Sequence, residues 1–113
     1  MIINNKAENG GGVYIDIYYR SYSPIYDSIY PPILHYGVFT IIKGIISSNE
    51  ATYNGGGIYN NGSFSMHGGE VSENKAVSGG GLYNTRIYSN DGGAIENNYA
   101  AYVGENDIVS NIS

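Results

Sequence analysis

The chain has 113 residues and contains neither cysteine nor tryptophan. Without cysteine it cannot form a disulfide scaffold, a cysteine-ligated zinc site or a catalytic thiol. Charged residues make up only 13% of the sequence, about half the usual share in a soluble globular domain. The formal net charge is −5, so we expect no nucleic-acid partner and no attraction to an anionic membrane surface.

Long apolar runs are also missing. No stretch reaches the roughly 18 apolar residues of a membrane-spanning helix, so we expect no membrane insertion. The first residues lack the basic region and apolar stretch of a secretory signal. Disorder is not expected either, because 42% of the residues are hydrophobic. The abundant residues are Gly, Tyr, Ile and Asn, and this combination calls for a search for repeats.

A repeat accounts for most of these residues. The Gly triplets 55–57 and 79–81 lie 24 residues apart, and a third triplet occupies 10–12. The shared unit reads aliphatic-x-x-Asn-x-Ala, a short spacer, and then Gly-Gly-Gly-aliphatic-Tyr. Four copies of its start occur, at Ile2, Ile46, Val71 and Ile95. Four aligned copies make chance a poor explanation.

The period indicates a parallel β-helix. Helical repeat proteins have longer units of roughly 33 to 47 residues, and they are not rich in glycine. Apolar residues within a unit are spaced by two, as in Phe64-x-Met66, which is strand spacing. We therefore predict a single all-β solenoid domain over 1–113, with about four coils of about 24 residues each. Residues 2–14 begin the first coil, 15–36 form a Tyr-rich insertion, and 37–113 supply the remaining coils.

Stacked coils place equivalent residues in columns at the strand spacing of about 4.8 Å. Aliphatic columns are expected at Val13, Ile58 and Leu82, and at Ile2, Ile46, Val71 and Ile95. An aromatic column is expected at Phe39, Phe64 and Tyr88. A structural Asn ladder, in which side-chain amides hydrogen-bond along the stack, is expected at Asn5, Asn49, Asn74 and Asn98.

Two further columns test the alignment. Lys6, Glu50 and Lys75 alternate in charge sign, and surface pairs of this kind contribute about 0.2–1 kcal/mol. The column Ile41, Met66 and Asn90 becomes polar in its last member. We therefore expect the C-terminal coil to be the weaker one.

The insertion 15–36 has no counterpart in the other repeats. Tyr residues recur every four positions from Tyr14 to Tyr30, which is the spacing of one helix face, but Pro24 argues against a helix. Tyr and Ser side by side are typical of binding loops. The segment is thus either a ligand-binding loop, an excursion that packs its aromatic residues against the coils, or a disordered stretch.

The repeat resembles the right-handed parallel β-helix repeats of bacterial surface adhesins and autotransporter passengers. It is similar in particular to the repeat of the chlamydial polymorphic outer-membrane proteins. Gly92-Gly93-Ala94-Ile95 fits the Gly-Gly-Ala-aliphatic motif of that family, and Val71-Ser72-Glu73-Asn74 fits its Phe-x-x-Asn motif with an aliphatic residue for Phe. The resemblance implies a right-handed coil and an adhesive protein at the cell surface or secreted. Members of that family usually have many more coils, so we expect the chain to be either a fragment or a truncated relative.

A polysaccharide-active enzyme is the least favoured reading. Glycoside cleavage requires paired carboxylates on one face, and the carboxylates of this repeat do not pair. His67 and Asp91 share a repeat position, which is how an oriented general base is arranged. No Ser or Cys column accompanies them, so a surface ion pair at a corner is the favoured interpretation.

We therefore expect a non-catalytic segment that needs no cofactor or metal and binds a glycan or a host surface protein through exposed tyrosines. The residues expected to contact this partner are Tyr14, Tyr18, Tyr22, Tyr26, Tyr30, Tyr59 and Tyr83. The alternative is a purely structural or self-assembling solenoid without a ligand. Self-assembly would run end to end, because neither end of the stack shows an obvious cap.

Overall fold

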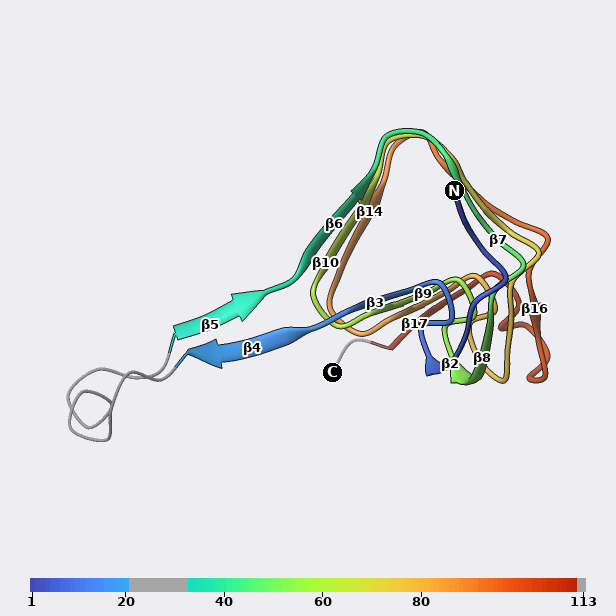
Figure 1. Ribbon diagram of the computed structural model, residues 1–113, viewed down its shortest axis with the longest axis horizontal. Helices are drawn as coiled ribbons and strands as arrows, with labels where there is room; N and C mark the ends of the chain where they lie inside the picture. Colours follow the sequence, from blue (N-terminus) through green and yellow to red (C-terminus); the bar gives the residue numbers. More distant parts are fainter. Residues whose placement is uncertain (21–32, 112–113) are drawn as a thin grey trace.

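The computed structural model describes residues 1–20 and 33–111, and in these ranges the protein is all-β. Parallel strands form four sheets, and one antiparallel hairpin extends away from them. The sheets enclose a roughly triangular cross-section, with the hairpin leaving one corner (Figure 1). No helix in the described residues is long and apolar enough to cross a membrane.

Each sheet collects strands from successive repeats. Sheet 1 contains β1 (Ile2–Ile3), β7 (Ile45–Ser47), β11 (Glu70–Ser72) and β15 (Ala94–Ile95). Sheet 2 contains β2 (Lys6–Asn9), β8 (Glu50–Asn54), β12 (Lys75–Ala76) and β16 (Tyr99–Ala100). Sheet 3 contains β3 (Val13–Ile15), β9 (Ile58–Asn60), β13 (Leu82–Asn84) and β17 (Ile108–Ser110). Sheet 4 contains β6 (Val38–Ile41), β10 (Ser63–Met66) and β14 (Ile87–Asn90).

The chain visits sheets 1, 2, 3 and 4 in that order and then repeats the circuit. We call the strands of one circuit a layer, so layer 1 begins at β1 and layer 4 at β15. The register within each sheet confirms the aligned columns. Ile46 pairs with Ile2 and Val71, and Leu82 pairs with Ile58. Glu50 pairs in strand register with Lys6 and Lys75, but its carboxylate forms no ion pair with either lysine. Among the described residues, the only ion pair is that of His67 with Asp91.

The core lies inside the triangle. Alternate residues of the parallel strands point inward, and Ile58, Phe64, Met66, Val71 and Leu82 are completely buried. The rings of Phe39, Phe64 and Tyr88 stack, with centroids 6.0 and 5.6 Å apart. Because every layer buries the same positions against its neighbours, the aliphatic and aromatic columns are the direct source of the hydrophobic stabilisation. Layer 4 adds no strand to sheet 4, and three of the four β14 residues are exposed, among them Asn90.

The predicted Asn ladder is confirmed. Asn49 donates from both its backbone N and its Nδ2 to Oδ1 of Asn74, and Asn74 donates in the same way to Asn98, every distance being 3.0 Å. Asn5 makes the same pair of bonds to Asn49. Each ladder residue follows a non-glycine residue with φ of 57° to 59°, namely Asn4, Ser48, Glu73 and Asn97. This left-handed residue turns the chain from sheet 1 to sheet 2 at the same place in every layer.

A second ladder was not predicted. The buried Asn60 donates from Nδ2 to Oδ1 of Asn84 over 2.7 Å, and Asn84 donates to Oγ of Ser110 over 3.2 Å. The sequence signal was present, because Asn60 and Asn84 follow the Tyr of the shared unit at the same repeat position. These amides close the corner between sheets 3 and 4.

The predicted boundary of the insertion needs correction. Ile15 belongs to β3, where it pairs with Asn60 and is buried, so it is part of the core. Asp16 and Gly37 occupy the positions of Asn61 and Gly62 in layer 2, and the N of Gly37 donates to the carbonyl of Asp16 over 2.6 Å. The insertion is therefore 17–36.

The ends of the insertion form an antiparallel hairpin of β4 (Ile17–Arg20) and β5 (Ile33–Tyr36). Tyr14 and Tyr18 both lie in strands, so the fourfold Tyr spacing does not mark a helix here, in agreement with the argument from Pro24. The two hairpin strands pair with each other and not with the parallel sheets. Tyr22, Tyr26 and Tyr30 lie outside the described residues.

Candidate functional site

The candidate site is a column of tyrosines on the outer surface of sheet 3. Tyr14, Tyr59 and Tyr83 are the central residues of β3, β9 and β13 and pair in register. Their neighbours in the strands point inward; Ile58 and Asn60, for example, are both fully buried. Strand alternation therefore directs all three phenol rings outward.

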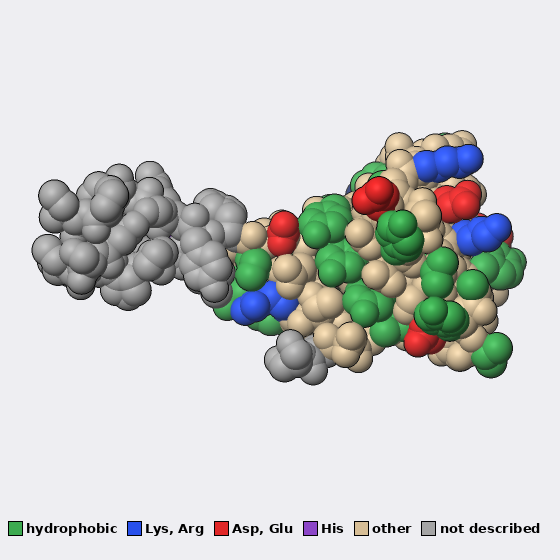
Figure 2. Space-filling model, turned by 90° about the horizontal axis from the view of Figure 1, so that it is seen from below, with side chains coloured by type: hydrophobic (Ala, Val, Ile, Leu, Met, Phe, Trp, Pro, Cys, Tyr) green, Lys and Arg blue, Asp and Glu red, His purple; other side chains and the backbone are tan. Residues whose placement is uncertain are grey.

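The rings stack closely. The centroids of Tyr14 and Tyr59 are 4.9 Å apart with planes inclined by 12°, and those of Tyr59 and Tyr83 are 5.5 Å apart with planes inclined by 4°. The ring faces thus pack against one another, so the column exposes the ring edges and the hydroxyl groups to a partner. Tyr14, at the end of the column, is 51% exposed. Figure 2 shows this side of the molecule, and hydrophobic side chains, among which the figure colours Tyr, gather across the face.

Burial and neighbouring groups raise the pKa of two of the three tyrosines, Tyr59 and Tyr14. Desolvation raises the pKa of Tyr59, and the neighbouring Tyr14, Tyr83 and Asp16 add to the effect. Desolvation and, after it, Asp16 raise the pKa of Tyr14. A neutral phenol both donates and accepts hydrogen bonds, so the column is a row of dual-function groups at strand spacing. The hydroxyl of Tyr83 already accepts a bond from Nδ2 of Asn111 over 3.2 Å.

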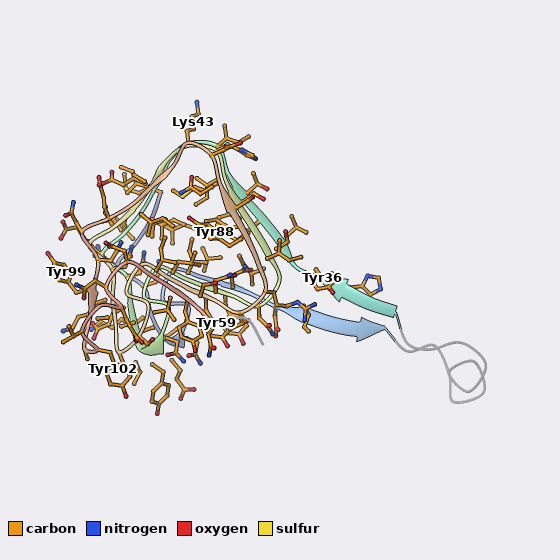
Figure 3. All side chains as sticks on the ribbon, turned by 180° about the vertical axis from the view of Figure 1, so that it is seen from behind. Tyr36, Lys43, Tyr59, Tyr88, Tyr99 and Tyr102 are labelled. Carbon is orange, nitrogen blue, oxygen red and sulfur yellow. The ribbon has the colours of Figure 1, made fainter. Side chains whose placement is uncertain are left out.

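The base of the hairpin borders the column. Oδ1 of Asp16 accepts bonds from the N of Ile17 over 2.7 Å and from Nδ2 of Asn61 over 3.1 Å. Arg86 donates to the hydroxyl of Tyr36 over 2.6 Å, and its guanidinium lies 4.5 Å from the centroid of the same ring. This cation–π contact ties β5 to layer 3. The repeat alignment could not reveal it, because Tyr36 lies outside the repeat; Figure 3 labels Tyr36 on the hairpin and Tyr59 on the parallel sheet.

The structure brings together only some of the predicted contact residues. Tyr14, Tyr59 and Tyr83 form one surface, as their shared repeat position indicated. Tyr18 lies in β4 of the hairpin, and its side chain, like Tyr22, Tyr26 and Tyr30, lies outside the described part of the structure. The candidate site is therefore the three-residue column.

His67 and Asp91 meet as their shared position predicted. Nδ1 of His67 lies 2.7 Å from Oδ1 of Asp91, and the two side chains are 50% and 72% exposed. The hydroxyl of Ser65, two residues before His67, accepts a bond from that of Ser89 over 3.3 Å. Within 1–20 and 33–111, no cluster of three or more His, Cys, Asp or Glu residues could hold a metal ion. The pair has the geometry of a surface ion pair.

Comparison of the chain with protein-family models, with curated proteins and with solved structures finds no match.

Proposed function

We propose that this protein is a right-handed parallel β-helix segment that binds an extended glycan without catalysis, through the column of Tyr14, Tyr59 and Tyr83. The observation that supports this proposal is the stack of three rings, which point outward and lie in register with centroids 4.9 and 5.5 Å apart. The circuit of four parallel sheets supports the β-helix. The handedness, and a place at the cell surface or outside the cell as part of an adhesive protein, come from the resemblance of the repeat motifs.

The chemistry of the column favours a glycan over an apolar ligand. Its outer surface combines apolar ring edges with neutral hydroxyls, and a sugar chain offers alternating C–H surfaces and hydroxyls of its own. Neighbouring strands hold the three rings, so little side-chain entropy is lost when a ligand binds. A straight row of evenly spaced groups suits a polymer better than a compact small molecule.

A glycan array tests the proposal. The unmodified chain is expected to bind one class of extended glycan, and Tyr59→Ser is expected to abolish that binding because it interrupts the column at its centre. Tyr99→Ser is the matched control, since Tyr99 is exposed to 56% on sheet 2, away from the column. Equal binding by the two variants would refute the role of the column.

The second candidate function is a structural segment that associates through its ends. An apolar groove of about 260 Å³ at the layer 1 end, lined by residues that include Ile2, Phe39, Ile41 and Ile46, favours it. Filament formation by the unmodified chain without glycan binding would support this function over the first. Turnover of an acidic polysaccharide that is lost in His67→Ala would instead support an enzyme.

A further inference from the structure

The two ends of the Asn ladder differ. Within the ladder each Asn donates from its N and Nδ2 to Oδ1 of the Asn in the next layer, so the bonds run in one direction from layer 1 to layer 4. Nδ2 also donates to a carbonyl of the preceding layer, as from Asn74 to Ile46 over 3.0 Å. The ladder therefore presents an acceptor, the Oδ1 of Asn5, at its layer 1 end and donors, the N and Nδ2 of Asn98, at its layer 4 end.

The layer 1 end is open. Asn5 is exposed, and its Oδ1 accepts no hydrogen bond from any residue that the structure describes. Strands β1, β2, β3 and β6 each have a parallel neighbour on one side only. The apolar groove lies on the same end and exposes the edge of the core around Ile2 and Phe39. Hydrogen-bonding and apolar groups are thus both available to a further layer.

The layer 4 end is closed by Asp107. Its Oδ1 accepts bonds from the N and Nδ2 of Asn98 over 3.0 and 3.1 Å, and so takes the part of the next ladder amide. The carbonyl of Asp107 accepts from the N of Leu82, just as the carbonyl of Gly81 accepts from the N of Ile58. Asp107 therefore stands in the glycine column of Gly12, Gly57 and Gly81.

This glycine column explains why an Asp there acts as a cap. A Cβ at Gly57 would lie 3.0 Å from Nδ2 of Asn74 in the next layer, and a Cβ at Gly81 would lie 2.7 Å from Nδ2 of Asn98. Glycine thus leaves the space that the next ladder Asn fills. The side chain of Asp107 occupies that space after layer 4, and it leaves no room for a fifth Asn.

We propose that the open end of layer 1 is a docking surface for the last layer of another β-repeat stack. The partner layer must carry Asn at the position of Asn98, to donate to Oδ1 of Asn5, and Gly at the position of Asp107, to admit the Asn5 side chain. A second copy of this chain carries Asp there and is excluded. The surface selects an uncapped repeat by sterics and hydrogen bonding together, and it does not depend on glycan binding by the tyrosine column.

Sedimentation velocity over a range of concentrations tests the cap. The unmodified chain is expected to remain a monomer, whereas Asp107→Gly is expected to form head-to-tail oligomers that grow with concentration. Asp107→Asn is the matched control, because its Oδ1 can still accept from Asn98 and its side chain still fills the space; it should stay monomeric. Oligomers of the unmodified chain, or equal behaviour of the two variants, would overturn the proposal.

An extended chain tests the docking surface independently of Asp107. A duplicate of residues 71–94 fused directly before Ile2, in place of Met1, supplies a layer with Asn in register with Asn5. We expect the midpoint of thermal unfolding to rise by several degrees and the Lys6 amide to become protected from hydrogen exchange. Replacing the added copy of Asn74 by Ala should remove most of the gain in the unfolding midpoint. An extended chain whose added layer leaves both readouts unchanged would disprove the docking surface.

Discussion

The most demanding prediction concerns the centre of the Asn ladder. Asn74→Ala removes a completely buried side chain that accepts bonds from the N and Nδ2 of Asn49 and donates to Ile46 and Asn98, each over 3.0 Å. Asn49 is itself 1% exposed, so its two N–H groups cannot turn to water. A buried donor left without an acceptor costs about 1–3 kcal/mol, which gives roughly 2–6 kcal/mol for the pair.

That loss is large against the 5–15 kcal/mol by which a typical domain is stabilised. Urea unfolding followed by circular dichroism measures it as a shift of the midpoint, at an unchanged slope if the denatured state is unaffected. Asn5→Ala is the control, because Asn5 is exposed and its own N–H still donates to Oδ1 of Asn49 after the substitution. We expect it to cost about 1 kcal/mol or less.

One outcome of the unfolding measurements would contradict this prediction. If Asn74→Ala and Asn5→Ala lower the free energy of unfolding by equal amounts, the buried amides do not act as an obligatory hydrogen-bond network. The columns of aliphatic and aromatic residues would then account for the stability alone.

Two further predictions follow from the structure. Deleting residues 17–36 joins Asp16 to Gly37 as Asn61 is joined to Gly62, so the shortened chain should keep its β-type circular dichroism and its cooperative unfolding; loss of the fold would show that the hairpin is required. Burial raises the pKa of Tyr59 above 10.0, so the folded state holds its proton more tightly than the unfolded state does. The stability contributed by the protonated Tyr59 should therefore be fully present below about pH 10 and be lost as the pH rises through the folded-state pKa. Phenolate absorbance should appear at higher pH than in the unfolded chain, and Tyr59→Phe should reduce that delay without abolishing it, because the pKa of Tyr14 is raised as well.

The repeat was readable from the sequence because each layer packs only against its neighbours. A position such as Ile46 meets the same environment in every layer, so its partners Ile2 and Val71 are given by the period alone. The same logic placed Tyr14, Tyr59 and Tyr83 on one surface. It also predicted the contact of His67 with Asp91.

Features outside the period could not be predicted in this way. The hairpin at 17–20 and 33–36 has no second copy to align, and the local signals there conflict, since the fourfold Tyr spacing is typical of a helix and Pro24 argues against one. The contact of Arg86 with Tyr36 joins a repeat residue to a non-repeat one. Such contacts depend on where the hairpin emerges in space.

The sequence by itself determined the parallel β architecture and the aligned columns of the repeated layers, because translational repetition converts spacing along the chain into spacing through the stack. Only the tertiary structure decided how the stack ends. Ile108 follows its partner Leu82 by 26 residues, whereas Leu82 follows Ile58 by 24, so no alignment at the common period pairs Asp107 with Gly81. Its capping role follows from where its carboxylate lies, 3.0 Å from the N of Asn98 in the space that a fifth ladder Asn would fill.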